Sequence, residues 1–438
     1  MATLAHAPSS GVKKSKMTSA LHSPNFRLYF FGQIVSISGT WIQNIAQGYL
    51  VFQLTKSELW LGIVACATGL PVILMTPVGG VIVERVPRRT LLIFTQTSQM
   101  TLAFVMAALT FSGAIQTWHI VLLAFLLGVT NTLDTPARQL IIVEMVGRDD
   151  LYSGIAMNSI MNNVGRIFGP ALAGILLVQF GTAWCFFLNG VSFIAVLIGL
   201  VLMKVPFAVR CIDNIPPLRQ LREGLEYSAK QPLVLSLLLI TALSGMFLFP
   251  LTQIMPAFAD VVLHSADQGY AAMNVGTGIG AVIAGIIVGI VTSRLGYTRV
   301  VVSGMFLGAA AMLLLALTNN ILLASFMTGL FGTFTLLEFV CINTSLQLIT
   351  PDYFRGRVMS LYSLGLIGFT PFGALAMGAI ANVISTPFSI ALYGILTAVI
   401  GAVIVVRWPM LMNRHLDDSP AQVVEIPSQI IVGSAVGD

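Results

Sequence analysis

The chain has 438 residues, of which 56% are hydrophobic and 9% are charged. A soluble domain carries roughly 25% charged residues, so this composition excludes an ordinary soluble protein. The formal net charge of +5 does not indicate a nucleic-acid partner, because the basic residues collect on one side of the apolar segments and form no basic groove. The composition therefore places the chain in a membrane.

Apolar segments of about 20 residues, long enough to cross a bilayer core, recur from Phe26 to Trp408. Continuous apolar runs exclude a membrane β-barrel, whose strands alternate in polarity, so we expect an all-α membrane protein. The twelve expected transmembrane helices are 26–54, 59–83, 90–112, 117–143, 151–178, 181–203, 233–258, 269–292, 300–317, 320–349, 357–384 and 387–408. Very short outward loops make neighbouring helices antiparallel.

The basic residues also indicate the orientation of the chain. Lys56 is the single basic residue expected on the outer side, so the positive-inside rule predicts a multi-pass protein of the cell inner (plasma) membrane with both termini cytoplasmic. The polar N-terminal segment lacks the apolar core of a signal peptide, and we expect none to be removed. The expected parts are a tail (1–25), a six-helix bundle (26–203), a cytoplasmic linker (204–231), a second six-helix bundle (232–408) and a tail (409–438).

An internal repeat predicts that the two bundles are pseudo-symmetric. Three features of the first half recur in the same order in the second half. The matching pairs are Gly80–Arg89 with Gly289–Arg299, Gly128 and Asp134 with Gly332 and Glu338, and Phe168-Gly169 with Phe372-Gly373.

Several segments resemble a known superfamily. The segment 80–89 resembles the signature of the major facilitator superfamily between helices 2 and 3, although Glu84 replaces an Asp and Pro87 replaces a Gly. The segment 165–174 resembles a helix 5 motif of antiporters in that superfamily. Its motif residues are Gly165, Gly169, Pro170 and Gly174. The segments 25–28, 134–139, 158–170 and 223–227 resemble the transmembrane secretion effector subfamily, which includes enterobactin exporters and macrolide efflux pumps.

The resemblance implies the major facilitator fold and export of a small amphipathic molecule by proton antiport with alternating access. It does not identify the substrate. A midplane Arg166 would suit an anionic or catecholate compound such as a siderophore, whereas Asp134 and Glu338 would suit a cationic drug, as in multidrug resistance. We favour a siderophore or related natural product, carried by a monomer whose other partners are protons and the lipid bilayer.

Two acidic residues are candidates for proton coupling. Asp134 is expected near the bilayer midplane, where Arg166 is its proposed partner and Arg138 a competing one. Glu338 takes the equivalent place in the second half, but Thr370 stands where Arg166 would be. A carboxyl without a cationic partner in the bilayer is expected to take up and release a proton near physiological pH. The alternatives are a structural salt bridge at Asp134 and a permanently protonated, structural Glu338.

Polar residues recur at helical spacing on two otherwise apolar helices, which predicts that these faces line a substrate cavity. Any one of them would serve equally well to hold helices together. The predicted cavity residues are Gln33, Ser36, Thr40, Asn44, Asn158, Asn162 and Arg166. A cytoplasmic gate is predicted in the first half, with a solvated basic loop as its alternative. The gate residues are Gly80, Glu84, Arg85, Arg88, Arg89 and Glu144. In the second half Leu348 stands where an acid is needed, so we expect the equivalent gate to be weak.

Other classes of protein find less support in the sequence. The five histidines and four cysteines form no metal-ligand cluster and no nucleophile–base set, so we expect no enzyme, no metal and no cofactor. A Walker motif, which an ATP-driven pump requires, is absent. A proton-coupled uptake symporter is the main alternative, followed by a membrane-embedded enzyme, and the duplicated architecture favours alternating access over a channel.

Overall fold

The computed structural model describes residues 19–147, 150–203 and 217–413. Within these ranges every regular element is a helix. The chain forms two compact units. Unit 1 comprises Met1–Lys56 and Ala67–Asp213, and unit 2 comprises Ser57–Cys66 and Asn214–Asp438.

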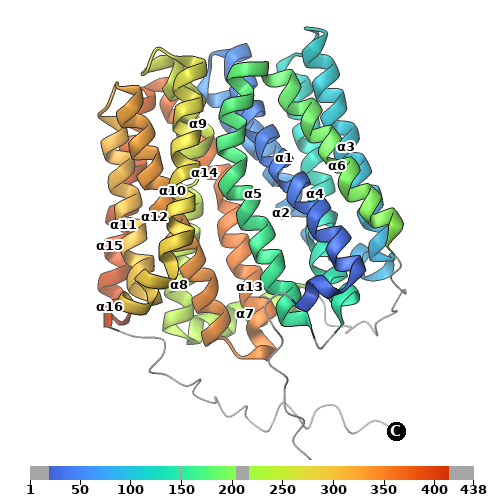
Figure 1. Ribbon diagram of the computed structural model, residues 1–438. Helices are drawn as coiled ribbons and strands as arrows, with labels where there is room; N and C mark the ends of the chain where they lie inside the picture. The colour runs from blue at the N-terminus through green and yellow to red at the C-terminus, as the bar shows by residue number, and fades with distance from the viewer. Residues whose placement is uncertain (1–18, 148–149, 204–216, 414–438) are drawn as a thin grey trace, which may run out of the picture. The chain divides into compact units, whose positions relative to one another are not determined.

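Unit 1 contains the first helices of the chain. These are the short 3₁₀ helix η1 (Ser19–His22), α1 (Pro24–Thr55), most of α2 (Glu58–Arg85), α3 (Arg88–Phe111), α4 (Thr117–Val146), α5 (Leu151–Phe180) and α6 (Thr182–Leu202). The Ser23 hydroxyl accepts a hydrogen bond from the Phe26 backbone N–H, and proline occupies the first turn of α1, both of which favour a helix start. α1 lies beside α5 and α6, and α3 packs between α6 and α4 (Figure 1).

One end of unit 1 has an aromatic and aliphatic core. Phe26 and Tyr29 of α1 pack with Leu92 of α3, Ile141 of α4 and Met161 of α5, and all five side chains are fully buried. Four helices therefore meet in one close-packed cluster, which fixes the depth at which their polar residues lie.

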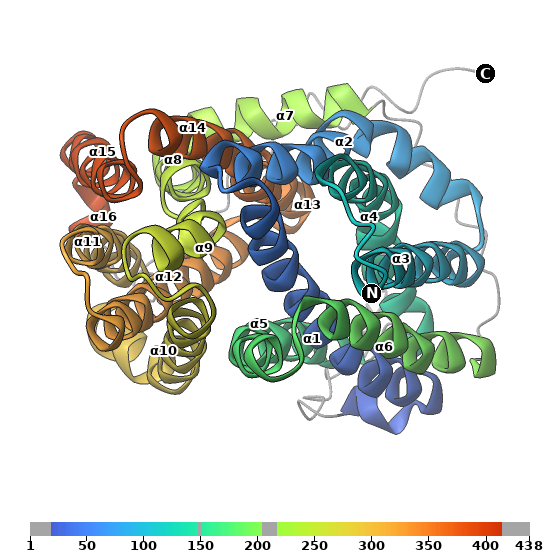
Figure 2. The same ribbon diagram turned by 90° about the horizontal axis from the view of Figure 1, so that it is seen from above.

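Unit 2 contains the remaining helices. These are α7 (Pro217–Lys230), α8 (Pro232–Phe247), α9 (Leu251–Val261), α10 (Ala266–Leu295), α11 (Tyr297–Ala316), α12 (Ile321–Ile349), α13 (Asp352–Ser363), the π-helical turn η2 (Leu364–Gly368), α14 (Phe369–Val383), α15 (Thr386–Arg407) and α16 (Met410–Asn413). α12 packs against both α10 and α11, and α11 against α15. α7 lies across the long axes of the other helices of this unit (Figure 2).

Each helix expected from the apolar segments is present, and two of them are interrupted. The segment expected at 233–258 is divided into α8 and α9, because Pro250 has no N–H to continue the hydrogen-bond ladder. The segment expected at 357–384 begins five residues earlier, at Asp352, and changes from α-helical to π-helical winding at Leu364–Gly368. The fold class predicted from the sequence is confirmed.

The first turns of α2 pack in unit 2. There the Thr386 hydroxyl donates to Glu58 over 2.9 Å and the Ser57 hydroxyl donates to Asn382 over 2.8 Å. Gly62 and Gly378 make close backbone contacts possible in the same region. The beginning of α2 thus packs with α14 and α15 inside unit 2, and the predicted bundle boundaries stay a prediction.

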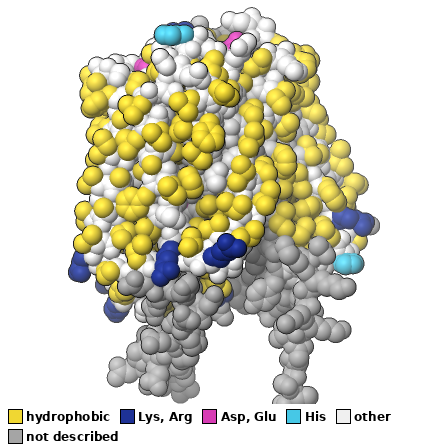
Figure 3. Space-filling model, turned by 60° about the vertical axis from the view of Figure 1, so that its left-hand side comes forward, with side chains coloured by type: hydrophobic (Ala, Val, Ile, Leu, Met, Phe, Trp, Pro, Cys, Tyr) yellow, Lys and Arg dark blue, Asp and Glu magenta, His cyan; other side chains and the backbone are white. Residues whose placement is uncertain are grey.

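The helices have the length and the surface that a bilayer requires. Among the described residues, ten helical segments are long and apolar enough to cross a membrane. α1 is not among them because its polar stripe lowers the average hydropathy, and α5 contributes a shorter apolar stretch, Phe168–Phe180. The face shown in Figure 3 is covered by hydrophobic side chains, and Lys and Arg gather toward one end of it.

Candidate functional site

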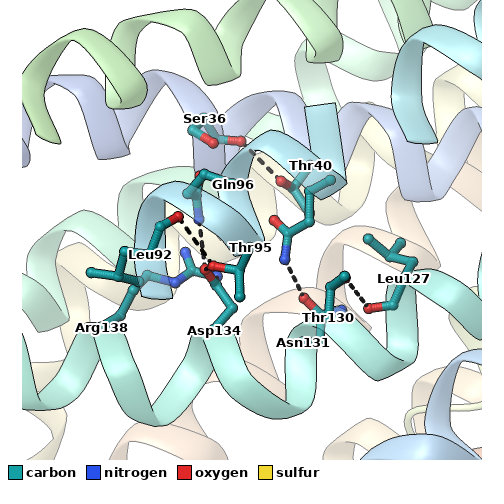
Figure 4. Close-up of polar contacts among 11 residues, drawn as sticks. Ser36, Thr40, Leu92, Thr95, Gln96, Leu127, Thr130, Asn131, Asp134 and Arg138 are labelled. Atoms are coloured by element: carbon teal, nitrogen blue, oxygen red, sulfur yellow. Dashed lines mark hydrogen bonds and ion pairs between the residues drawn. The ribbon is translucent and has the colours of Figure 1, made fainter. Parts of the chain in front are cut away.

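Asp134 lies at the centre of a polar network in unit 1. Its side chain is 0% exposed, and Thr95 and Gln96 of α3 each donate a hydrogen bond to its Oδ1 atom over 2.8 Å. The Arg138 guanidinium, one turn along α4, forms an ion pair with Oδ2. These contacts are drawn in Figure 4. The buried carboxylate therefore has two hydrogen-bond donors and a counter-ion, as a charge in this environment requires.

Arg138, the competing partner predicted for Asp134, is thus the partner present in the structure. The side chain of Arg166, the other predicted partner, lies outside the described residues, as does that of Asn162. Asn158, on the same helix, is partly buried. Arg138 is 26% exposed, so its side chain is less enclosed than the carboxylate that it pairs with.

Glu338 lies in unit 2 and has fewer hydrogen-bond donors around its carboxyl group than Asp134 has. Its side chain is 1% exposed, and the Ser244 hydroxyl of α8 donates to its Oε1 atom. Among the described residues, no donor reaches Oε2 and no cation pairs with the carboxyl group. The proton-coupling role expected for this acid stays a prediction.

The contrast between the two acids follows from the residues at matching places. Gly304 of α11 follows Gly289 at the interval at which Thr95 follows Gly80. A Cβ atom at Gly304 would lie 3.1 Å from the Glu338 Cβ, so α11 packs there against α12 without a side chain. Ile342 stands one turn after Glu338, where Arg138 follows Asp134. Gly304 and Ile342 therefore supply neither a hydrogen-bond donor like Thr95 nor a counter-ion like Arg138.

The polar stripe of α1 divides into buried and exposed members. Gln33 and Ser36 are buried in unit 1, and the Thr40 hydroxyl donates back to the Ser36 carbonyl over 3.0 Å. Asn44 is exposed. Gln43, which the spacing argument left out, is buried and accepts a hydrogen bond from Asn189 of α6 over 2.7 Å. Part of the polar surface of α1 thus serves helix packing inside the unit.

The gate residues predicted in the first half form two distinct contacts. The Arg88 guanidinium at the start of α3 lies 2.5 Å from the Glu144 carboxylate near the end of α4. Arg89 donates instead to the Leu200 and Val201 carbonyls at the C-terminal end of α6, over 2.7 and 2.8 Å. The helix dipole stabilises a cation at this end of a helix.

Of two other predicted gate residues, Gly80 lies in α2, and the side chain of Glu84 lies outside the described part of the chain. Arg85 is exposed. The counterpart in unit 2 contains no matching ion pair among the described residues, because Tyr297 takes the place of Arg88 and the exposed Leu348 takes that of Glu144. Arg299 donates to the Met412 carbonyl over 2.6 Å.

The glycines of the helix 5 motif let α5 approach α1. Cβ atoms at Gly165 and Gly169 would collide with Ile37 and Trp41, respectively. Pro170 and Gly174 continue the motif as buried residues. In unit 2, Gly373 lies in the same way against the Met246 carbonyl at the end of α8. The repeat inferred from Phe168-Gly169 and Phe372-Gly373 therefore corresponds to equivalent helix contacts.

Three partners of the acids were not singled out by sequence reasoning. Thr95 and Gln96 contact Asp134, and Ser244 contacts Glu338. Thr95 and Gln96 are adjacent polar residues in an apolar helix, and Ser244 is a polar residue close to a proline break. The polarity of these three residues in apolar helices was a signal of a functional or packing role. Their distance from the acids along the chain gave no indication of which acid each one contacts.

Comparisons with known proteins agree with this architecture. Residues 15–432 match the family model described as transmembrane secretion effector. The chain is 26% identical over 376 residues to the staphyloferrin A transporter of Staphylococcus aureus, covering 85% of this chain and 93% of that protein. It is 25% identical over 409 residues to the enterobactin exporter EntS of Escherichia coli, covering 91% and 95%.

Solved structures show the same fold at low sequence identity. A bacterial homologue of the lysosomal transporter Spinster aligns with a TM-score of 0.68 and 15% identity, covering 94% of this chain and 100% of that one. The nucleoside transporter NupG aligns with a TM-score of 0.65 and 11% identity, covering 87% and 98%. The chain therefore belongs to the transmembrane secretion effector family of major facilitator transporters.

Proposed function

We propose that this protein exports a small amphipathic molecule of the siderophore type in exchange for protons, and that Glu338 carries the coupling proton. The single observation that carries this proposal is the environment of Glu338: a fully buried carboxyl whose contacts among the described residues include one hydroxyl donor and no cation.

The energetic argument concerns the charge of that carboxyl group. A charged side chain at the centre of a membrane helix costs about 2.5–3.5 kcal/mol or more unless it is paired. Ser244 supplies one hydrogen bond, which offsets only part of that cost. Glu338 therefore favours its neutral form in this arrangement and becomes charged when water or another donor reaches it. Alternating exposure to the two sides of the membrane would then move one proton per cycle.

Asp134 is the second candidate for proton coupling. Its two hydrogen-bond donors and its ion pair with Arg138 already occupy both carboxylate oxygens. We therefore place the proton on Glu338 first and regard Asp134 as the group that holds α3 and α4 together.

The substrate class rests on the relatives. The staphyloferrin A transporter and the enterobactin exporter are both siderophore transporters, and each aligns over most of its length. We extend this substrate class, and the outward direction of the exporter, to the present chain. We further propose a monomer without enzymatic activity in the cell inner membrane with both termini cytoplasmic, as the distribution of Lys and Arg indicates.

The test uses purified protein in liposomes with an imposed pH gradient and a panel of apo-siderophores and cationic drugs. We expect one siderophore class to discharge the gradient in the wild type and not in Glu338→Gln. Substrate exchange without a gradient should persist in Glu338→Gln, which separates lost coupling from lost folding. Glu226→Gln, an exposed acid of α7, is the control. Gradient-driven transport in Glu338→Gln would refute the proposal, and co-accumulation of substrate with protons would indicate an uptake symporter.

A further inference from the structure

Ser244 makes two structurally important contacts, one through its side chain and one through its backbone. Its hydroxyl donates to Glu338 of α12. Its backbone carbonyl accepts hydrogen bonds from both Leu248 and Phe249, over 2.9 and 3.0 Å, at the place where α8 ends. The residue that contacts the buried acid is therefore also the last acceptor before the break between α8 and α9.

The other hydroxyl groups of α8 behave differently. Ser236 donates to the Leu233 carbonyl over 2.9 Å and Thr241 to the Leu237 carbonyl over 2.8 Å, so both bond to the preceding turn of their own helix. Ser244 donates to a neighbouring helix instead. Back-bonding of serine to the preceding turn bends helices, so the direction of the Ser244 hydroxyl affects the geometry of the helix end.

The end of α8 is closely packed against a second irregular segment. A Cβ atom at Gly245 would lie 2.6 Å from the Gly365 carbonyl and 2.8 Å from the Leu366 carbonyl of the π-helical turn. π-helical turns are rare and recur at functional sites. A change in the bend of α8 would therefore be transmitted to the turn that joins α13 and α14.

We propose that Ser244 is a positioning residue that links the protonation state of Glu338 to the break between α8 and α9. With Glu338 charged, Ser244 must donate to it. When Glu338 binds a proton, its own O–H becomes a donor to Ser244 Oγ, and the serine proton turns back to a carbonyl of the preceding turn. The hydrogen bond between α8 and α12 then reverses its donor and acceptor. The hydrogen bonds from the Leu248 and Phe249 amides to the Ser244 carbonyl break more often.

The titratable neighbours of Glu338 are few. Cys341, on α12 itself, lies within electrostatic reach of it. In the described part of the chain, α8 and α11 place no charged side chain against the carboxyl. The change in hydrogen-bond direction at Ser244 is thus the local response available to this acid. The inference rests on the proposed role of Glu338.

The test is hydrogen–deuterium exchange of the full-length protein in nanodiscs, followed in the peptide that contains Leu248 and Phe249. Glu338→Gln mimics the neutral acid at constant pH. At a pH high enough to ionise Glu338 in the wild type, we expect about fivefold faster exchange of this peptide in Glu338→Gln, the factor that corresponds to the loss of one hydrogen bond. In a Ser244→Ala background, Glu338→Gln should add no further change, whereas Ser244→Thr should restore the response.

Ser236→Ala is the matched control, because it removes a buried hydroxyl that already bonds within α8. Glu338→Gln should accelerate exchange as strongly in that background as in the wild type. An undiminished response in Ser244→Ala would overturn the role of Ser244 and leave the proposed function intact. Gradient-driven transport in Glu338→Gln would instead refute the proposed function, whatever the exchange result.

Discussion

Gly304 places no side chain at the point where α11 approaches Glu338. A Cβ atom at this position would lie 2.8 Å from the Phe334 carbonyl oxygen and 3.1 Å from the Glu338 Cβ. The matching residue in the first half, Thr95, supplies a hydroxyl to Asp134. The close approach of α11 and α12 is therefore what leaves Glu338 dependent on Ser244.

Replacing Gly304 with alanine should force α11 away from α12. Overpacking of this kind costs about 1–3 kcal/mol, and we expect Gly304→Ala to lower the unfolding temperature in detergent. A thiol-reactive dye can follow unfolding through Cys185 and Cys341, which are buried in the native protein. Gly289→Ala is the control, because no atom lies within 4 Å of the added carbon. Equal unfolding temperatures for the two variants would contradict the predicted close packing.

Removing Arg138 should destabilise unit 1 more than removing the charge of Asp134. Arg138→Gln leaves a fully buried carboxylate without its counter-ion, at a cost near 3 kcal/mol on the usual scale for broken buried pairs. Asp134→Asn retains an oxygen for Thr95 and Gln96 and leaves an Arg138 that is 26% exposed. In the dye assay, Arg138→Gln should have a lower unfolding temperature than Asp134→Asn. The double variant should recover part of the lost unfolding temperature. The reverse order would exclude a charged Asp134 in the resting protein.

The pattern of apolar segments predicted every transmembrane helix, because a bilayer imposes one length and one polarity on each span. The break after Phe247 and the π-helical turn at Leu364–Gly368 were not predicted, since both depend on contacts between helices. Glu338 was identified because an acid in an apolar helix is costly wherever its partners lie. Ser244 was missed because one serine in an apolar helix is unremarkable until its neighbour across the bundle is known.

The ion pair between Arg88 and Glu144 should hold α3 and α4 together at the end of unit 1 that we expect to be cytoplasmic. Glu144→Gln removes a partner that lies 2.5 Å from the guanidinium and is 14% exposed, and we expect it to change the accessibility of the cytoplasmic side. Labelling of single cysteines from each side of the membrane measures this change. Ser293→Ala, at the place that corresponds to Glu84, is the comparison variant in the second half, where no such pair is present among the described residues. Equal effects of Glu144→Gln and Ser293→Ala would contradict the predicted asymmetry.

Arg357 should fix the linker helix α7 to α13 within unit 2. Its guanidinium is 3.1 Å from the Glu223 carboxylate and 11% exposed, and it lies over the Tyr353 ring. Tyr227 stacks on Phe354, with ring centroids 4.3 Å apart. α7 packs on the start of α13, and Leu225 of α7 remains exposed.

The variant Arg357→Ala removes both the ion pair and the cation–π contact. Hydrogen bonds to charged groups contribute about 1.5–3 kcal/mol each, so we expect exchange of the α7 backbone amides to accelerate about tenfold or more. Arg357→Lys should restore only part of the protection, because lysine lacks the planar fork that fits a carboxylate and stacks on a ring. Glu226→Gln is the control, since its ion pair with Arg222 is exposed and screened by solvent. Unchanged exchange in Arg357→Ala would mean that Tyr227 and Phe354 alone anchor the linker helix.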